Sequence, residues 1–195
     1  MSSTPASLRI IRDEHAALAA MLQSLLWLIR HGPQQDQRQR FFDTVRAMLF
    51  YIDEFPERLH HPKESDLLFP RVAKRAPETL PVIARLEQDH MKGEQQVREL
   101  QHLLLAWEWL GEERREAFVQ ACERYLSFYL EHMRLEEQEI LPAAQRVLEP
   151  SDWQALDAAF AANRDPLTGH APEPAYERLF QRILEVAPAP IGLGA

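Results

Sequence analysis

Apolar side chains recur at helical spacing along four long stretches of this chain, and this periodicity constrains the fold more than any other feature. From Ile11 to Ile29 the apolar positions, with one histidine among them, are spaced four, three, four, three and four residues apart, along one face of a helix. Similar faces run through residues 41–55, 83–104 and 118–135. No stretch alternates apolar and polar residues between turn signals, so we predict no strands. The sequence predicts an all-α fold, an antiparallel up-down-up-down four-helix bundle.

The character of the sequence changes after residue 149. Residues 151–162 are typical of a short helix with a capping serine and an acid in its first turn. Residues 163–174 are rich in Pro, Gly, Asp and Thr and indicate a linker, and residues 175–186 indicate a last short helix. We therefore predict a bundle over residues 1–149 and a C-terminal helical extension over residues 150–195 that packs on it.

Charge and cysteine content exclude several classes of protein. The 195 residues carry 22 Lys and Arg against 30 Asp and Glu, a net charge of −8, which disfavours binding to nucleic acid phosphates. No run approaches the ~18 apolar residues of a membrane span, and the N-terminal residues lack the apolar region of a secretory signal, so we expect a cytoplasmic protein. One cysteine, Cys122, excludes an internal disulfide and a cysteine-based zinc or iron–sulfur site within the chain.

Histidines occupy positions on these helical faces where buried apolar residues are expected. His15, His90 and His132 each replace an apolar residue of the first, third and fourth face, and His60 follows Leu59, which continues the second. A buried imidazole must be hydrogen-bonded or bound to something. Taken singly, each of these histidines is more simply a hydrogen-bonded core residue than a ligand.

A glutamate follows three of these histidines at a distance of four residues. The pairs are His60 with Glu64, His90 with Glu94, and His132 with Glu136. Residues four apart on a helix stack on one face, so each pair can direct an imidazole and a carboxylate at one point. Three glutamates buried in one core without a cation would leave costly unpaired charges. The sequence therefore predicts a metal site built from these seven side chains, His15 included, which are too many for one tetrahedral zinc ion.

The types of ligand indicate which metal is bound. Imidazoles and carboxylates without thiolates suit iron, manganese or zinc, and carboxylates from several helices of a bundle can bridge two ions. We predict two non-haem iron ions with an oxo or hydroxo bridge, for which manganese or zinc could substitute. Two six-coordinate ions offer about twelve positions. The seven side chains and the bridge leave about one of these for a small diatomic molecule or peroxide.

The order of these motifs along the chain resembles the hemerythrin-like, or HHE cation-binding, family. The segments that carry the resemblance are IRDEH at 11–15, FPERLHHPKE at 55–64, EQDH at 87–90 and EHMRLEE at 131–137. The resemblance covers about residues 8 to 148 and implies an up-down-up-down bundle that holds two non-haem irons. It also implies terminal nitrogen ligands at His15, His60, His90 and His132, and bridging carboxylates at Glu64 and Glu136.

Two features depart from that family pattern. Oxygen-carrying hemerythrins have a histidine four residues after the third-helix histidine, where this chain has Glu94. An anion in place of a neutral imidazole should stabilise the ferric state and lower the potential, which favours redox reactivity or sensing over reversible oxygen carriage. Pro62 lies between His60 and Glu64, and proline interrupts helical hydrogen bonding, so His61 could replace His60 or act behind it.

Three functions are compatible with this reading. The first is a di-iron protein that binds or reacts with O2, NO or peroxide, in sensing, scavenging or iron handling. The second is a di-iron oxidase or peroxidase-type enzyme that turns over at the same irons. The third is a metal-free helical interaction module, which would have to explain three buried glutamates without a counter-charge. The sequence leaves the choice between carrier, sensor and enzyme open, and likewise the oligomeric state, for which a homodimer is one option.

Overall fold

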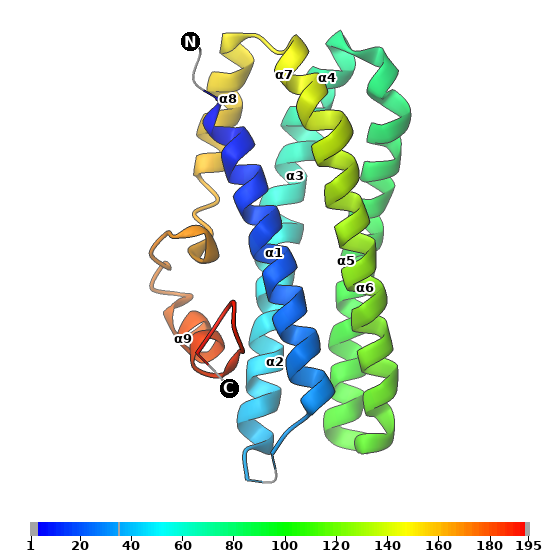
Figure 1. Ribbon diagram of the computed structural model, residues 1–195, viewed down its shortest axis with the longest axis vertical. Coiled ribbons are helices and arrows are strands. Elements are labelled where there is room, and N and C mark those ends of the chain that lie inside the picture. Colours follow the sequence, from blue (N-terminus) through cyan, green and yellow to red (C-terminus); the bar gives the residue numbers. More distant parts are fainter. Residues whose placement is uncertain (1–3, 35, 194–195) are drawn as a thin grey trace.

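Four long helical segments run alternately up and down, side by side, in the computed structural model, which describes residues 4–34 and 36–193 (Figure 1). They are α1 (Ala6–His31), a second segment from α2 (Arg38–Ile52) to α4 (Phe69–Arg75), α5 (Leu80–Leu110), and a fourth from α6 (Arg115–Leu135) to α7 (Leu141–Val147). Helix α1 contacts α2 and α6, and α5 contacts the same two helices, so the four form a closed square. The predicted all-α bundle is confirmed.

The second and fourth segments contain π-helical turns. These turns are η1 (Asp53–His60) and η2 (Glu64–Leu68), separated by α3 (His61–Lys63), and η5 (Glu136–Ile140). Each closes with a backbone hydrogen bond over five residues, donated by the residue before a proline: His61 to Pro56, Phe69 to Glu64, and Leu141 to Glu136. In an α-helix a proline ring collides with the carbonyl four residues earlier, and a wider turn accommodates it. The helix therefore continues through Pro62 with an altered register.

A layer of buried histidine and glutamate side chains, called the polar layer below, divides the core of the bundle into two hydrophobic clusters. Each long segment contributes apolar side chains to both clusters and a histidine or glutamate between them. The flanking core residues are Ile11 and Leu18 on α1, Phe55 and Leu68 on the second segment, Leu86 and Val97 on α5, and Met133 and Ile140 on the fourth. The histidines of the predicted site thus lie at one level of the bundle, held from above and below by packed apolar side chains.

Beyond the bundle, two helices and a short turn run back along one flank. These are α8 (Pro150–Ala161), η6 (Pro166–Thr168) and α9 (Glu177–Val186). Helix α8 lies against α1 and α9 against α2 (Figure 1). The turns η3 (Pro77–Thr79) and η4 (Glu112–Arg114) join the long segments at the two ends of α5.

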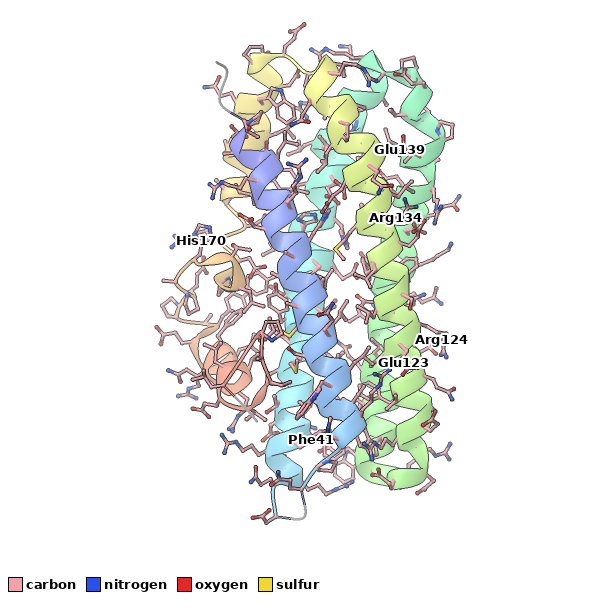
Figure 2. All side chains as sticks on the ribbon, viewed as in Figure 1. Phe41, Glu123, Arg124, Arg134, Glu139 and His170 are labelled. Atoms are coloured by element: carbon pink, nitrogen blue, oxygen red, sulfur yellow. The ribbon has the colours of Figure 1, made fainter. Side chains whose placement is uncertain are left out.

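Charged side chains cover the outside of the bundle. Arg124 and Arg134 are exposed on α6, and Glu139 is exposed on η5 (Figure 2). Among the described helices, none combines the length and the apolar character that crossing a bilayer requires.

Candidate metal centre

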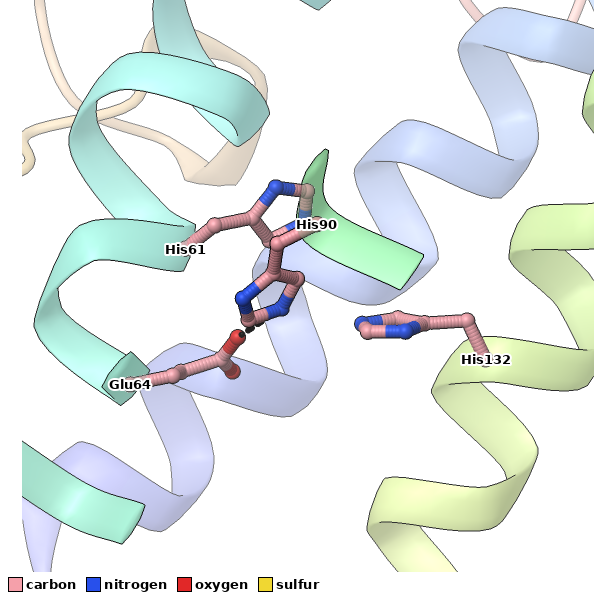
Figure 3. Close-up of side chains that lie close together, drawn as sticks. All are labelled: His61, Glu64, His90 and His132. Carbon is pink, nitrogen blue, oxygen red and sulfur yellow. Dashed lines mark ion pairs between the residues drawn. The ribbon is translucent and has the colours of Figure 1, made fainter. Parts of the chain in front are cut away.

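Five histidines and two glutamates meet in the polar layer, and all are buried, with His90 the most exposed at 8 %. They form two sets of potential ligands, and within each set the donor atoms lie within 4.8 Å of one another. The His61 set comprises His61, Glu64, His90 and His132 (Figure 3), and the His60 set comprises His15, His60, Glu64 and Glu136. Glu64 belongs to both sets, so a single carboxylate connects two adjacent positions.

Two consecutive histidines reach the layer because the helix changes register between them. Successive residues of an α-helix point about 100° apart, so one of two neighbours normally turns away from a narrow site. Here His60 is the last residue of a π turn and His61 the first of α3, and both side chains are buried. Glu64 begins the next π turn, with its Oε1 atom 2.7 Å from His60 Nε2. The structure thus brings in both histidines instead of exchanging one for the other.

The atoms that face the centre of the layer lack hydrogen-bond partners. They are His60 Nε2, His90 Nε2, His132 Nε2, and both carboxylate oxygens of Glu64 and of Glu136. His60 Nε2 lies close to Glu64, but this contact does not have the geometry of a hydrogen bond. Buried polar atoms are nearly always satisfied, and orphaned ones call for a missing partner. Nitrogen and oxygen donors that converge without hydrogen bonds between them fit metal ions, so these residues fit a binuclear site.

The two glutamates have opposite electrostatic environments. Burial raises the pKa of Glu136 to about 7, and the neighbouring charge of Glu64 adds to the rise. Burial acts in the same direction on Glu64, but the facing imidazoles of His60 and His90 outweigh it and hold the pKa of Glu64 well below its usual range. At neutral pH the shared carboxylate is therefore ionised, and it is available to a cation without loss of a proton.

His15 is expected to keep its proton above neutral pH when no metal is present. Burial lowers the pKa of His15, but the carboxylates of Glu136 and Glu137 outweigh burial and raise the pKa from 6.5 to about 9. The folded chain thus binds this proton more tightly than the unfolded chain does. The resulting stability is complete below pH 6.5 and is lost as the pH rises through about 9.

We therefore expect the metal-free protein to lose on the order of 3 kcal/mol of unfolding free energy between pH 6.5 and pH 9. His60 acts in the same direction, because Glu64 and Glu14 outweigh burial and hold the pKa of His60 well above its usual value. Urea unfolding of chelator-treated protein at the two pH values measures the change. A metal ion competes with protons for the imidazoles, so loaded protein should gain stability over the same range. A metal-free protein that is equally stable at both values would contradict this assignment.

Each imidazole has a polar partner on its Nδ1 side. Carboxylate oxygens lie within hydrogen-bond distance of three of them, 2.9 Å from His15 (Glu137), 2.6 Å from His60 (Glu14) and 3.1 Å from His61 (Glu57). The Asp89 carboxylate faces His132 Nδ1 at 3.8 Å, which is too long for a hydrogen bond. For His90 the partner is Ser65 Oγ at 3.0 Å, which in turn donates to Glu87. A hydrogen bond from Nδ1–H fixes the tautomer and leaves the lone pair of Nε2 for a metal. The layer therefore has the organisation of a metal site, in which polar groups behind the imidazoles, the outer supports, hold the ligands in place.

The support of His61 is a buried network. Glu57, 3 % exposed, lies one turn before His61 and accepts hydrogen bonds from the hydroxyls of Tyr125, at 2.9 Å, and Tyr129. Burial raises the pKa of Glu57 to about 7, although both hydroxyls act to lower it. The ring of Tyr129 also stacks on His61, with centroids 5.6 Å apart and planes 4° from parallel. Position and orientation of His61 are thus fixed from two sides.

The two sets differ in their access to solvent. A groove of about 250 Å³ reaches His61 and His90 from the surface, past the exposed side chains of Met91 and Glu94. Near His15 and His60, on the flank covered by the extension, the corresponding space is about 10 Å³. A small molecule therefore has an approach to the His61 set and almost no room beside the His60 set.

Six of the seven side chains predicted to bind metal are brought together, and Glu94 is not. The Glu94 side chain is 55 % exposed and its carboxylate lies 3.0 Å from Arg98, outside both sets. His61, expected either to replace His60 or to act behind it, joins the layer as a further donor beside His60. The other three histidines of the chain, His31, His102 and His170, are exposed, as His170 shows on the flank of the molecule (Figure 2).

Sequence reasoning also missed the outer carboxylates. Glu14 directly precedes His15 in the sequence but supports His60, and Asp89 directly precedes His90 but faces His132. Glu57 precedes His61 by four residues, the same spacing as the predicted His–Glu pairs in reverse order, and this was the one signal that could have revealed it.

Comparison with known families adds a result independent of the geometry. The family model described as hemerythrin HHE cation binding domain matches residues 6–144 of the chain. The matched residues span all four long helical segments and every residue of both sets, and they end before α8. No curated protein matches the chain. The resemblance carried by the sequence motifs is confirmed.

Proposed function

The chain belongs to the hemerythrin HHE cation-binding family, and from that premise we propose that it holds two non-haem iron ions at which O2, NO or peroxide binds or reacts. Sensing, scavenging and iron handling are the roles compatible with such a centre. The proposal adds the identity of the metal and of the small molecule to the binuclear cation site that the family and the buried ligand sets support.

The observation that carries the proposal is the shared position of Glu64. A carboxylate that belongs to two adjacent sets of imidazoles is suited to bridge two ions, which is how di-iron sites are built in helical bundles. The ligand chemistry agrees, since five imidazoles and two carboxylates without a thiolate suit iron, with manganese and zinc as alternatives. Counting one position for each of these seven side chains and a second for the shared Glu64, they would fill about eight of the roughly twelve positions of two six-coordinate ions, so room for an external molecule remains.

Each residue has a defined task in this centre. Bound iron would supply one- and two-electron redox chemistry. The five imidazoles would hold the ions from all four long segments. For His15, His60 and His61, the outer carboxylates hold the Nδ1 protons on the side away from the ions. The packed apolar clusters above and below the layer exclude bulk water, which strengthens every electrostatic interaction inside it.

The groove beside His61 and His90 favours uncharged molecules. Its lining includes three carboxylates, from Glu57, Glu87 and Glu94, and no basic side chain other than the two histidines. Negative charge at an entrance repels anions and tolerates neutral species. Dioxygen, nitric oxide and hydrogen peroxide therefore suit this approach better than a negatively charged substrate does. Because Glu94 lies outside both sets, the lowered potential inferred from it is not part of the proposal.

Metal analysis and gas reactivity test this function. Protein purified without added metal or chelator is analysed by plasma mass spectrometry, then reloaded anaerobically with Fe²⁺ and mixed with O2, NO or H2O2 while the visible spectrum is followed. We expect two irons per chain and a spectral change with at least one of the three molecules. Stoichiometric change would favour binding or sensing, and repeated consumption of O2 or peroxide would favour the enzyme. A folded chain that stays metal-free after ferrous loading would refute the proposal and leave the interaction module.

A further inference from the structure

The C-terminal extension lies outside the residues that the family model matches, yet it reaches the metal centre. Helix α8 is anchored to the start of α1 by Asp157, whose Oδ1 atom accepts hydrogen bonds from the backbone N–H of Ser7, at 2.7 Å, and from its hydroxyl, at 2.6 Å. From this anchor the chain runs along the flank of the bundle to the level of the polar layer. The extension is therefore placed to act on the ligands.

Two of its side chains contact His60 and its support. The ring of Phe160 meets the ring of His60 edge-on, with centroids 5.7 Å apart. Just beyond α8, the Nδ2 atom of Asn163 donates a hydrogen bond of 2.9 Å to Glu14 Oε2, the same oxygen that lies 2.6 Å from His60 Nδ1. Asn163 is 5 % exposed, and its own carbonyl oxygen accepts a hydrogen bond from Lys63. The extension thus covers the outer side of His60.

The hydrogen bonds fix how Glu14 is oriented. Asn163 donates to Glu14 Oε2 from one side and His60 Nδ1 lies beside the same oxygen on the other, so the two contacts together orient the carboxylate. The space around Glu14, His60 and Asn163 is about 10 Å³, at the lower limit for one water molecule. Water therefore cannot readily take the place of the amide if a bulkier apolar side chain replaces it.

The two ligand sets depend on different parts of the chain. In the His61 set the outer carboxylate of His61 itself, Glu57, is held by Tyr125 and Tyr129, which belong to the bundle. In the His60 set the outer carboxylate of His60 itself, Glu14, is held by Asn163 of the extension. A change in the extension should therefore affect one set and spare the other.

We propose that the C-terminal extension is a structural part of the metal centre, in which Asn163 is a positioning residue that orients Glu14 and His60 and thereby sets the affinity of the His60 position. This inference rests on the proposed binuclear site. It adds that the two metal positions are not equivalent, because different parts of the chain determine their affinities. The bundle alone determines the His61 position, and the extension tunes the His60 position.

The test is a metal titration of the full chain. Metal-free wild type and Asn163→Leu are titrated anaerobically with Fe²⁺ in a calorimeter, and bound iron is counted after desalting. We expect wild type to bind two ions, and Asn163→Leu to bind one with wild-type affinity and the other about tenfold or more weaker, the usual loss when an outer support is removed. Asn163→Ala is titrated beside it and decides the result if circular dichroism shows that the leucine variant does not fold.

A matched control separates positioning from packing. Asp157→Ala removes the anchor of the extension on Ser7 without touching Glu14 or His60. It should lower the melting temperature of the metal-free protein and leave both iron affinities unchanged. If the Asn163 variants bind both ions as wild type does, or lose both ions to the same extent, the positioning role is overturned. If wild type itself binds fewer than two ions, the proposed function has failed instead.

Discussion

Replacing Glu64 by alanine is expected to abolish binding at both metal positions, from two irons per chain to almost none. Glu64 is the one residue common to the two sets, and both of its oxygens are fully buried without a hydrogen-bond partner. Oε1 lies 2.7 Å from His60 Nε2, and Oε2 lies 3.3 Å from His90 Nε2. Because the loss of the shared carboxylate leaves each position with one ligand fewer and with less negative charge to balance the two ions, both should dissociate. Plasma mass spectrometry after anaerobic ferrous loading measures the effect.

Two further substitutions serve as controls for this result. Glu136 belongs to the His60 set alone, so Glu136→Ala should release one ion and retain the other. Glu94→Gln changes an exposed carboxylate that pairs with Arg98, so iron content should stay at the wild-type value. Retention of two irons by Glu64→Ala, or their loss from Glu94→Gln, would show that the ligands have been assigned to the wrong carboxylates.

The bundle and the level of its polar layer could be predicted because both follow from a regular period. Apolar residues at helical spacing define which face of each segment is buried, and a histidine within such a face must lie in the core. His15, His90 and His132 interrupt the face of α1, α5 and α6, and the structure places all three at one level between the two hydrophobic clusters.

The membership of the ligand sets could not be derived in the same way, because the spacing rule assumes an α-helix. The π turns before Pro62 and Pro70 alter which residues face inward, so His61 enters the layer together with His60. On α5 the helix is regular, and four residues after His90 the Glu94 side chain reaches solvent beside the groove. A spacing of four residues brings two side chains to one face, but the neighbouring helices determine whether the second one is covered.

The outer supports are further beyond sequence reasoning because they join distant segments. Asn163 meets Glu14 across 149 residues, from a stretch that has no apolar period and was predicted only as a linker. Short polar residues in such a stretch usually indicate turns, and nothing in their spacing identifies the partner. Contacts of this kind depend on where the extension docks on the bundle, to which the packing of Phe160 against His60 contributes.

One glycine of α5 leaves the space that the Glu57 network occupies. A β-carbon built on Gly93 would lie 1.8 Å from the Tyr129 hydroxyl oxygen and 2.8 Å from Glu57 Oε1. Both are buried groups that hydrogen-bond to each other, and the Tyr129 ring is stacked on His61, so neither can move aside without disturbing a ligand. The hydroxyl and the carboxylate can therefore meet only where α5 has no side chain.

Gly93→Ala should consequently destabilise the protein, although the same change in an unobstructed helix adds up to about 1 kcal/mol of stability. Overpacking a closed core costs about 1 to 3 kcal/mol, and we expect a net loss in that range, measured by urea unfolding of the metal-free protein. In the double variant Gly93→Ala/Tyr129→Phe the closest clash disappears with the hydroxyl, so part of the loss should be recovered, while the ring carbon Cζ, at 2.8 Å, keeps the recovery incomplete. An alanine variant as stable as wild type would mean that Tyr129 and Glu57 can separate freely, and the support of His61 would then be weaker than its geometry indicates.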